Sequence, residues 1–565
     1  MLNCQFLAFL LWVLRKLELA VCRVFSAVRI IMEQNAVIRP RQNLAVKVIN
    51  TFIGGVRSTV ENSTHGVLTV MNFGCKKKVP PVDNELLYLS ATTLAEKIRK
   101  AELTSEEVVK AYINRIGEVN GLINAVIEGR YQEAINEARF ADQLVRSGVL
   151  TEAEIAERYP LLGIPFTAKE SILIKGLPST CGLVCRKGMV AEEDSEPVQR
   201  LRACGAIPLA LTNTSEICMW WETYNKLHGR TNNPYDTTRT VGGSSGGEAA
   251  LIAAAGSVVG IGTDLGGSIR IPANFTGIFG HKPTQGIVPR GGQFPPALEE
   301  ISPYVAVGPM TRYATDLKLM LSAFIGKDET ERLKLSSPVD IRSIKVYYML
   351  DDGGSPGATP VSQEIKDGIK KVTSVLSMEG LVVQEVNIKH LKLGFLIWCA
   401  YLSTVKEQRI SKIMKGNVKK DEDVHREMLK WFSGKSEHTF PIILNACAQD
   451  YLAPLMRKPL EFFIQCGDRL KEELLALLEP EPAVFLYPTF PHAAAHHGQI
   501  LANPFNASYS VVFNAVSLPV TQCPLGFSSS GLPFGVQIVT APENDRLSIS
   551  LAEHLEVKLG GWTPP

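Results

Sequence analysis

The strongest constraint on the fold of this chain is a glycine- and serine-rich block at residues 242–270, which reads GGSSGGEAALIAAAGSVVGIGTDLGGSIR. It contains two glycine-flanked turns, one holding Ser244 and the other Ser268. A helix of small residues at 248–255 and an apolar strand at 258–261 are predicted between them. Glycine allows the backbone to turn sharply and leaves its N–H groups open to a ligand. One helix and one strand can therefore bring the two serine turns face to face.

Ser268 is the predicted nucleophile of this block. Its hydroxyl can attack a carbonyl group, and exposed N–H groups of the same turn can hold the resulting oxyanion. The residues after it can open a helix, whose N-terminus offers further free N–H groups and a field that favours an anion. A Gly-Gly-Ser turn by itself is usually structural, so the assignment depends on what else the chain contains.

At this block the chain resembles the amidase signature family. A second element of that family lies upstream, where residues 163–170 (GIPFTAKE) match the pattern G-x-P-x-x-x-K-[DE]. Further matching pieces follow in the family's order, at residues 263–270 (TDLGGSIR), 280–284 (GHKPT) and 535–538 (GVQI). The resemblance runs from about residue 87 to residue 562. Finer details resemble the fatty-acid amide hydrolase branch of the family, at residues 87–90 (LYLS), 218–220 (CMW), 232–236 (NNPYD) and 518–524 (LPVTQCP).

The resemblance implies an α/β fold with a large mixed β-sheet core flanked by helices. The residue pattern points to the same class, because short apolar segments alternate with helical ones from residue 90 onward. Strands are predicted at 162–167, 207–211, 258–261, 344–350, 381–386, 484–487 and 534–539. Residues 104–107 (TSEE) fit a helix capping box. The mostly helical residues 392–479 are interpreted as a cap or pocket wall.

The resemblance also implies a catalytic Ser-Ser-Lys triad in which Ser268 carries the acyl group. Lys169 is then the general base. A lysine must be neutral to accept a proton, burial favours the neutral form, and the apolar run at 161–168 fits a buried site. Ser244 is the predicted relay, because a hydroxyl can both donate and accept a hydrogen bond. The resemblance implies a cis peptide bond before this serine, next to Gly243.

Other residues are predicted to support the reaction. By the resemblance, the oxyanion is held by the backbone N–H groups of Leu265, Gly266, Gly267 and Ser268. Four neighbouring residues are candidates for the wall of an apolar substrate channel, although core packing explains each of them equally well: Cys218, Met219, Trp220 and Trp221. Asp264 and Arg270 are expected to form an ion pair that fixes the nucleophile turn, and Ser245 to support it or to cap the following helix.

A rival interpretation comes from the same block. Residues 243–247 (GSSGG) formally match the G-x-S-x-G elbow of α/β-hydrolases, with Ser245 as nucleophile. That motif needs a buried strand directly before it, whereas residues 232–240 (NNPYDTTRT) indicate a polar loop. It also needs a downstream acid and a histidine. The available histidines have no obvious paired acid, and the adjacent two are expected to face solvent: His492, His496 and His497.

Composition argues against several other classes. The net charge is +2, and no dense basic patch with interleaved aromatic residues points to nucleic acid. The eleven cysteines are scattered, and the spacing of Cys181 and Cys185 is poor for zinc. Residues 260–262 (GIG) lack the third glycine and the lysine of a nucleotide site. The predicted chemistry requires neither a metal nor a cofactor.

Residues 1–80 are predicted to be a membrane-associating extension and residues 81–565 the amidase domain. The uncharged stretch at 1–14 is shorter than the roughly 20 residues of a spanning helix. The charges that follow fall on one side of a helical wheel, a pattern typical of a helix in a membrane interface: Arg15, Lys16, Glu18, Arg23 and Arg29. A signal anchor or a docking helix would give a similar pattern. The predicted location is the surface of intracellular membranes, and a homodimer is left open.

The predicted reaction is therefore the hydrolysis of carboxylic amides, with fatty acid amides as substrates that yield a free fatty acid and an amine. An amidase or esterase of the same family that acts on a non-lipid substrate is the alternative. A non-catalytic role, as a subunit of an amidotransferase complex, is a third class. It is disfavoured because all three triad positions are filled.

Overall fold

The computed structural model describes residues 40–355, 357–407, 409–416, 422–453 and 457–565. The N-terminal pattern of apolar and charged residues at 1–29 lies outside these ranges. Backbone contacts divide the chain into two units, Met1–Asn62 and Ser63–Pro565. Helix α2 (Pro40–Met71) supplies the described part of the first unit. Within the described residues, no helix has the length and apolar character that a membrane span requires.

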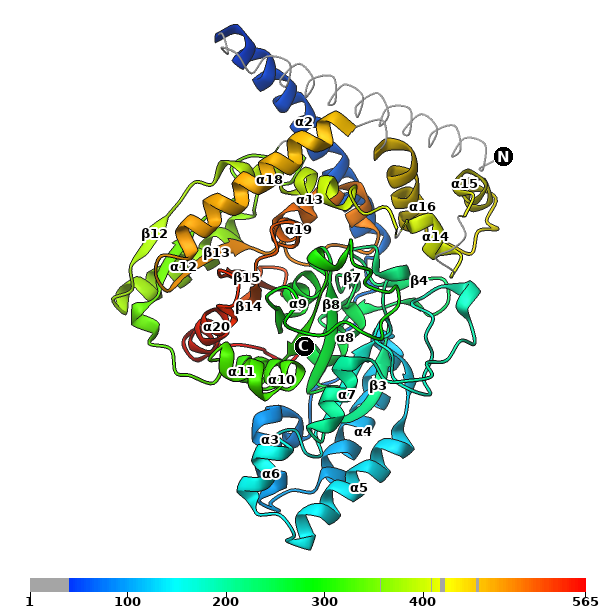
Figure 1. Cartoon of the computed structure of the whole chain (residues 1–565). Helices are drawn as coiled ribbons and strands as arrows, with labels where there is room; N and C mark the ends of the chain where they lie inside the picture. The colour runs from blue at the N-terminus through cyan, green and yellow to red at the C-terminus, as the bar shows by residue number, and fades with distance from the viewer. Residues whose placement is uncertain (1–39, 356, 408, 417–421, 454–456) are drawn as a thin grey trace. The chain divides into compact units, whose positions relative to one another are not determined.

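The second unit is built on one large mixed sheet, as the resemblance implies, and this sheet has eleven strands (Figure 1). The strand order is β1-β3-β2-β8-β10-β9-β14-β15-β13-β11-β12. β2 runs parallel to β3 and β8, β11 runs parallel to β12 and β13, and the remaining pairs are antiparallel. The strands are β1 (Val126–Gly129), β2 (Pro165–Lys169), β3 (Ile207–Thr212), β8 (Val259–Asp264), β9 (Phe279–Lys282), β10 (Ala306–Thr311), β11 (Lys345–Tyr348), β12 (Val383–Glu385), β13 (Ala483–Pro488), β14 (Val520–Phe527) and β15 (Pro533–Val539).

All seven predicted strands are present in this sheet, with ends that differ by a few residues. Four further strands were not predicted from the sequence: β1, β9, β10 and β14. β10 reads AVGPMT and β14 reads VTQCPLGF, so each contains a proline that argues against a strand inside a sheet. Both lie between two neighbours all the same. The tertiary context has overridden the local signal.

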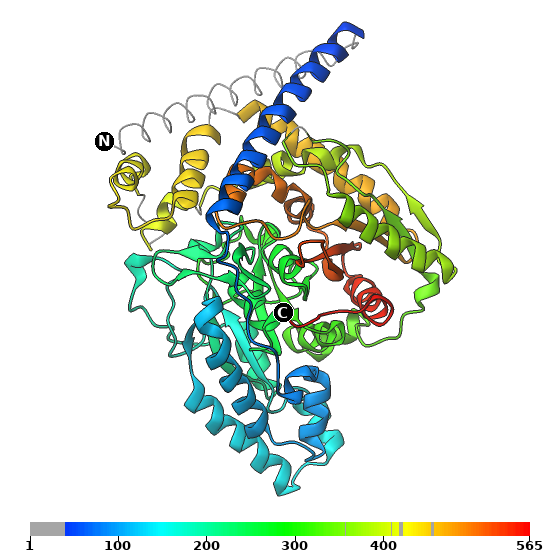
Figure 2. The ribbon, with the colours of Figure 1, turned by 180° about the vertical axis from the view of Figure 1, so that it is seen from behind.

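Helices at the β1 end of the sheet follow the predicted pattern. α3 (Ala91–Arg99), α4 (Ser105–Ile123) and α5 (Tyr131–Ser147) occupy the segment expected to be helical, and α4 and α5 lie side by side in both views (Figures 1 and 2). Thr104 and Glu107 form the predicted capping box: the Thr104 hydroxyl accepts from the Glu107 N–H at 3.2 Å, and the Glu107 carboxylate accepts from the Thr104 N–H at 2.9 Å.

Residues 392–479 are mostly helical, as expected. α13 (Gly394–Leu402) and α18 (Arg457–Leu478) pack against each other and join the main core. The shorter helices α14 (Ile410–Met414), α15 (Val424–Phe432) and α16 (Phe440–Cys447) form a separate apolar cluster. That cluster includes Ile217 and packs against Met219, which belong to the loop after β3. It therefore lies against a loop that contributes to the predicted site.

One local prediction is wrong. Residues 232–240, expected to be a polar loop, contain the paired strands β6 (Asn232–Asn233) and β7 (Asp236–Thr240). Their side chains are polar, so the sequence lacks the apolar pattern that predicts a strand. Some of these polar side chains are nevertheless buried and hydrogen-bonded. The buried Asn233 amide donates to the backbone carbonyls of Thr240 and Phe275, at 3.2 and 2.9 Å. This small sheet is separate from the eleven-stranded one.

Candidate active site

The structure places Lys169 and Ser244 in direct contact. Lys169 is the last residue of β2, and its side chain is fully buried. Its Nζ donates to Ser244 Oγ at 2.7 Å and to Thr263 Oγ1, on the neighbouring strand β8, at 2.8 Å. The lysine thus has two hydroxyl partners in a site closed to water. This is the predicted pairing of a base with a relay serine.

The turn around Ser244 precedes α8 (Gly246–Ala253) and is tightly enclosed. The peptide bond between Gly243 and Ser244 is cis, as the resemblance implies. A side chain at Gly243 would place its Cβ 2.8 Å from the Trp220 carbonyl oxygen, so only glycine fits there. The Thr214 hydroxyl donates to the Ser244 carbonyl at 2.9 Å. The tight fit at Gly243 and the Thr214 hydrogen bond together fix the position of Ser244.

The second serine turn meets the first, as the block predicts. The Ser245 N–H donates to the Ser268 carbonyl at 3.1 Å. Ser268 lies between β8 and α9 (Arg270–Thr276) and keeps an exposed fraction of 6%, whereas Ser244 and Lys169 keep none. Of the three predicted triad residues, Ser268 is therefore the one that a substrate can reach.

Two tryptophans orient the backbone of the Ser268 turn. The Trp398 indole donates to the Leu265 carbonyl at 3.0 Å, and the Trp221 indole donates to the Gly266 carbonyl at 2.8 Å. A carbonyl and the N–H of the same planar peptide point in opposite directions. Fixing the Leu265 carbonyl therefore turns the Gly266 N–H away from Trp398. The sequence analysis did not identify Trp398, which lies on α13 far along the chain.

Three of the four predicted oxyanion donors are available. The N–H groups of Leu265, Gly266 and Ser268 have no hydrogen-bond partner in the described part of the chain. The N–H of Gly267, however, donates to Asp264 Oδ1 at 2.7 Å. The geometry thus assigns this fourth N–H to the scaffold of the turn, because a nearby carboxylate already occupies it.

The predicted pair of Asp264 and Arg270 is present and fully buried. Arg270 Nε and Nη2 lie 3.1 Å from the two carboxylate oxygens of Asp264. Arg270 also donates to Gln537 Oε1 and Asn514 Oδ1, both at 2.6 Å. Burial raises the pKa of Asp264, but the Arg270 guanidinium and further hydrogen bonds lower it more, so it lies well below its ordinary value. The pair ties the nucleophile turn to β15 and to α19 (Ser508–Ala515).

Glu170 points away from Lys169. Its carboxylate accepts from the backbone N–H groups of Thr180 at 2.9 Å and Gly182 at 3.2 Å. It therefore supports the loop that follows β2 and leaves the lysine its hydroxyl partners.

Glu248 is a buried acid beside Lys169 that the sequence analysis missed. Its carboxylate accepts from Thr167 Oγ1 at 2.7 Å and from Thr212 Oγ1 at 2.8 Å. Thr167 precedes Lys169 by two residues, so both side chains leave the same face of β2. Burial raises the pKa of Glu248 to about 8, against the effect of both hydroxyls and of Lys169. The sequence signal for Glu248 is that it is the one acidic residue in the predicted helix of small residues at 248–255.

The two predicted wall residues after β3 lie in different environments. Cys218 is partly exposed, and its sulfur lies 3.5 Å from Thr214 Oγ1 and 3.5 Å from the sulfur of Cys181. Met219 packs against the apolar cluster of α14 and α16, and its carbonyl accepts from Asn445 Nδ2 at 2.8 Å. The next two wall candidates, Trp220 and Trp221, are in ring contact with each other.

The structure disfavours the elbow alternative. The Ser245 hydroxyl is fully buried and donates to the Thr263 carbonyl at 3.3 Å. The expectation that the adjacent histidines face solvent is wrong for His496, which is 3% exposed because Thr238 and Thr69 enclose it. Burial lowers the pKa of His497 to about 4, which makes it a weak base. No group of metal-binding side chains occurs within the described ranges.

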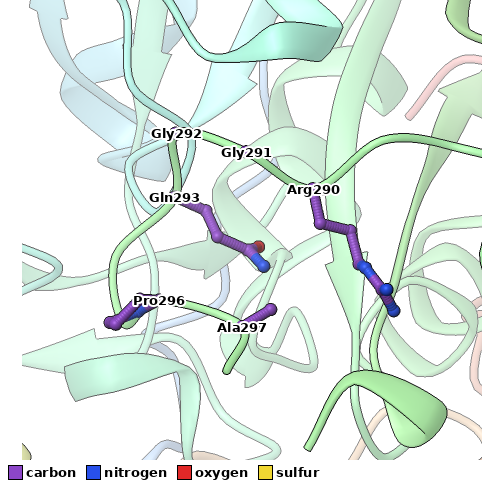
Figure 3. A pocket seen from close by; sticks show the side chains of 6 residues that line it. All are labelled: Arg290, Gly291, Gly292, Gln293, Pro296 and Ala297. Atoms are coloured by element: carbon purple, nitrogen blue, oxygen red, sulfur yellow. The ribbon is translucent and has the colours of Figure 1, made fainter. Parts of the chain in front are cut away.

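A pocket of about 340 Å³ lies on the loop that packs against the chain after Lys169 (Figure 3). Backbone hydrogen bonds join the loop to that segment: Phe294 N–H to the Ser171 carbonyl at 2.9 Å, and Leu173 N–H to the Gly292 carbonyl at 3.1 Å. Its lining consists of Arg290, Gly291, Gly292, Gln293, Pro296 and Ala297. The predicted triad residues do not line it, so this pocket is distinct from the site around Ser268.

Comparison with known proteins identifies the family of the chain. The family model described as Amidase matches residues 107–548. The chain is 44% identical to fatty-acid amide hydrolase 2-A of Danio rerio over 86% of its own length and 92% of that protein. It is 42% identical to fatty-acid amide hydrolase 2 of Homo sapiens, with the same coverage. A solved structure of a fatty acid amide hydrolase aligns with a TM-score of 0.67 at 22% identity, covering 86% of this chain and 87% of the other.

Proposed function

The chain belongs to the amidase signature family and is an amide hydrolase, and we propose that it cleaves fatty acid amides through a triad of Ser268, Ser244 and Lys169. The observation that carries the triad is the 2.7 Å contact between Lys169 Nζ and Ser244 Oγ in a fully buried site. The Lys169 side chain thus lies within hydrogen-bond reach of the relay hydroxyl, the position that a general base requires.

In the proposed reaction, Lys169 takes a proton from Ser244, and Ser244 takes one from Ser268. Ser268 Oγ then attacks the amide carbonyl. The N–H groups of Leu265, Gly266 and Ser268 stabilise the oxyanion, and the two indole contacts hold the turn in place before the reaction begins. The proton returns through Ser244 to the leaving amine. Water, activated by the same relay, cleaves the acyl-enzyme.

Support for a long acyl chain comes from an aromatic row beside the nucleophile turn. Trp221 contacts Trp398 and Phe395, with ring centroids 5.8 and 6.1 Å apart. Phe395 in turn contacts Phe505 at 4.8 Å, and Phe505 is 39% exposed. The row thus leads from the turn to the surface, and we propose that an alkyl chain packs along these rings. The most similar relatives reported above carry the name fatty-acid amide hydrolase 2.

Labelling with a long-chain acyl fluorophosphonate, followed by mass mapping of the modified peptide, tests the nucleophile. Modification at Ser268, and loss of labelling in Ser268→Ala, is the expected result. Modification at Ser245 would favour the elbow mechanism instead. A folded protein that takes no label would contradict the proposal of a reactive serine.

A substrate series tests the acyl specificity. We expect kcat/KM to rise with the acyl chain length of a primary amide, because each buried methylene contributes about 0.8 kcal/mol. A Phe395→Ala variant should flatten that dependence while leaving the cleavage of short amides intact. Equal rates for short and long chains would instead support a non-lipid amidase, and faster cleavage of matched esters would support an esterase.

The proposal extends to the N-terminus. Residues 1–80 would attach the enzyme to the surface of intracellular membranes, and residues 81–565 would form the amidase domain. The support is the one-sided charge pattern at residues 15–29 that follows an apolar stretch. Recovery of the full-length protein in the soluble fraction after gentle lysis would contradict this part of the proposal.

A further inference from the structure

Two thiols lie beside the proposed site, and no step of the proposed reaction uses them. Cys181 and Cys218 are 37 residues apart in the chain, yet their sulfurs are 3.5 Å apart. Both are free cysteines. Cys181 is fully buried, whereas Cys218 is partly exposed at the site. Cys218 is therefore the more accessible residue of the pair, and its sulfur contacts that of Cys181.

The backbone holds this pair in an unusual conformation. Cys181 and Cys218 both lie in the left-handed region, with φ of 48° and 62°, and so does the neighbouring Ile217 at 45°. Such a conformation is uncommon for residues other than glycine. The two loops are joined by a hydrogen bond from the Ile217 N–H to the Cys181 carbonyl at 2.9 Å. The fold thus maintains strained positions that bring the two sulfurs together.

Each cysteine is one contact away from a residue that holds the triad. Cys218 lies 3.5 Å from Thr214 Oγ1, and Thr214 donates to the carbonyl of the relay serine, Ser244. Cys181 lies between two residues whose N–H groups bind Glu170, the neighbour of Lys169 in the chain. A change in the distance between the sulfurs would act on both ends of the 2.7 Å contact between lysine and serine.

The two thiols also differ in acidity. Burial raises the pKa of Cys218, but its hydrogen bonds with Cys181 and Thr214 act in the opposite direction, and the pKa lies well below its ordinary value. Burial and the same hydrogen bond raise the pKa of Cys181 well above its ordinary value. A thiolate is the nucleophilic form of cysteine, and a neighbouring thiol can resolve its oxidised product. Cys218 is thus the more reactive thiol of the pair.

We propose that Cys181 and Cys218 are a dithiol that reacts with hydrogen peroxide to form a disulfide and thereby switches off amide hydrolysis. The Cys218 thiolate attacks one peroxide oxygen, the O–O bond breaks, and the hydroxide released takes up a proton as water. The resulting sulfenic acid is attacked by the Cys181 sulfur. Its hydroxyl group leaves with the Cys181 proton as a second water. The two thiols supply the two electrons that reduce the peroxide.

Disulfide formation requires a movement of the two sulfurs, and we expect the loops that carry them to follow. The bond length is about 2.05 Å, so the sulfurs must approach by about 1.5 Å from their present separation. That movement displaces Thr214 and the loop bound to Glu170, and with them the contact between Ser244 and Lys169. The loss of activity rests on the proposed function, whereas the reactivity of the dithiol does not.

The test uses the full-length protein treated with hydrogen peroxide and mapped by mass spectrometry without reduction. We expect a Cys181–Cys218 disulfide peptide, together with at least a fivefold loss of amide hydrolysis that dithiothreitol restores. Peroxide treatment that oxidises other cysteines but yields no such peptide would overturn the dithiol. A disulfide that forms without loss of turnover would overturn the switch. Because the peptide is detected by mass, the dithiol remains testable even if the protein hydrolysed no fatty acid amide.

Matched variants separate this pair from the other cysteines. Cys181→Ser should abolish the disulfide, and prolonged peroxide treatment should then oxidise the unresolved Cys218 sulfenic acid to a sulfinic acid, so that dithiothreitol no longer restores activity. Cys185→Ser removes a nearby exposed thiol that contacts the Met414 carbonyl and should leave the reversible response unchanged. A reversible response that survives in Cys181→Ser, or disappears in Cys185→Ser, would contradict the assignment. Mapping of the unaltered protein decides the question if Cys181→Ser does not fold.

Discussion

At the scale of single residues, Lys169 combines full burial with hydroxyl partners only. Within the described residues, no carboxylate lies at ion-pair distance from its Nζ, although Glu248 is bound to a residue of the same strand face. Lys169→Met preserves the volume of the side chain but removes the base. We expect turnover to fall by about 10²–10⁴-fold, the usual contribution of general acid–base catalysis. Circular dichroism should show an unchanged fold.

Lys282 provides the matched control for this variant. It is also a fully buried lysine, and among the described residues its Nζ donates a hydrogen bond to the Pro283 carbonyl alone, at 3.3 Å. Burial lowers the pKa of Lys282 to about 7. Lys282 contacts a backbone carbonyl, whereas Lys169 contacts the relay serine. We therefore expect Lys282→Met to retain turnover. Near-normal turnover of Lys169→Met, or an equal loss in both variants, would reject Lys169 as the base.

Glu248 gives a prediction about stability and pH. Burial raises its folded pKa from 4.5 to about 8, so the folded state favours the protonated acid. The stability contributed by this group is fully present below pH 4.5 and is lost as the pH rises through about 8. Between pH 6 and pH 8 the wild type should lose about 2 kcal/mol that Glu248→Gln, which cannot ionise, does not lose. Urea unfolding at both pH values measures the difference, and parallel pH profiles would contradict the pKa shift.

The sequence points to the proposed reacting groups more clearly than to the residues that hold them. Lys169, Ser244 and Ser268 lie in motifs whose glycines constrain the backbone, so local chemistry reveals them. Trp398 orients the nucleophile turn from a helix 133 residues further along the chain, and nothing near it in the sequence marks that role. The engagement of the Gly267 N–H by Asp264 is a matter of side-chain geometry within the turn, which spacing alone does not determine.

At the scale of secondary-structure elements, the capping boxes allow a comparison of the same contact in two helices. Thr104 caps α4, a helix of 19 residues that joins the main core, and Thr151 caps α6 (Glu152–Arg158), which buries only Ile155. Replacing an N-cap threonine by alanine costs about 1 kcal/mol. We expect Thr104→Ala to lower the free energy of unfolding by about that amount. Thr151→Ala should cost less, because a peripheral helix can fray without unfolding the domain. A larger cost for Thr151→Ala in urea unfolding would contradict this ranking.

Strands were predictable where they are apolar runs and unpredictable where the sheet itself supplies the stability. β13 (AVFLYP) and β3 (IPLALT) carry a strong apolar signal and are completely buried. β9 (FGHK) has four residues, two of them basic, yet all are buried. His281 in β9 is satisfied by Asp545 at 3.0 Å and Thr521 at 2.9 Å. Such long-range partners stabilise a polar strand, and a local pattern cannot reveal them.

At the scale of the whole molecule, the large unit carries the sheet, the core and every residue of the proposed site. Residues Ser63–Pro565 form that unit. Removing residues 1–62 should therefore leave the melting temperature and the hydrolysis of a water-soluble amide unchanged. Binding to vesicles that contain phosphatidylserine should be lost, because the deleted segment carries the predicted interfacial helix. Co-sedimentation with the vesicles measures that loss, and undiminished binding would contradict the proposed attachment.

A slightly longer deletion tests where the amidase domain begins. Removing residues 1–80 also deletes Thr69, whose hydroxyl lies 3.2 Å from His496 Nε2, and Val79, which is 4% exposed in the core. Burial of a valine side chain contributes about 2 kcal/mol, so this variant should be less stable than the shorter deletion by at least that amount. Chemical unfolding of the two truncated proteins gives the comparison. Equal stability would place residues 63–80 with the N-terminal extension, whereas a loss would make them part of the catalytic domain.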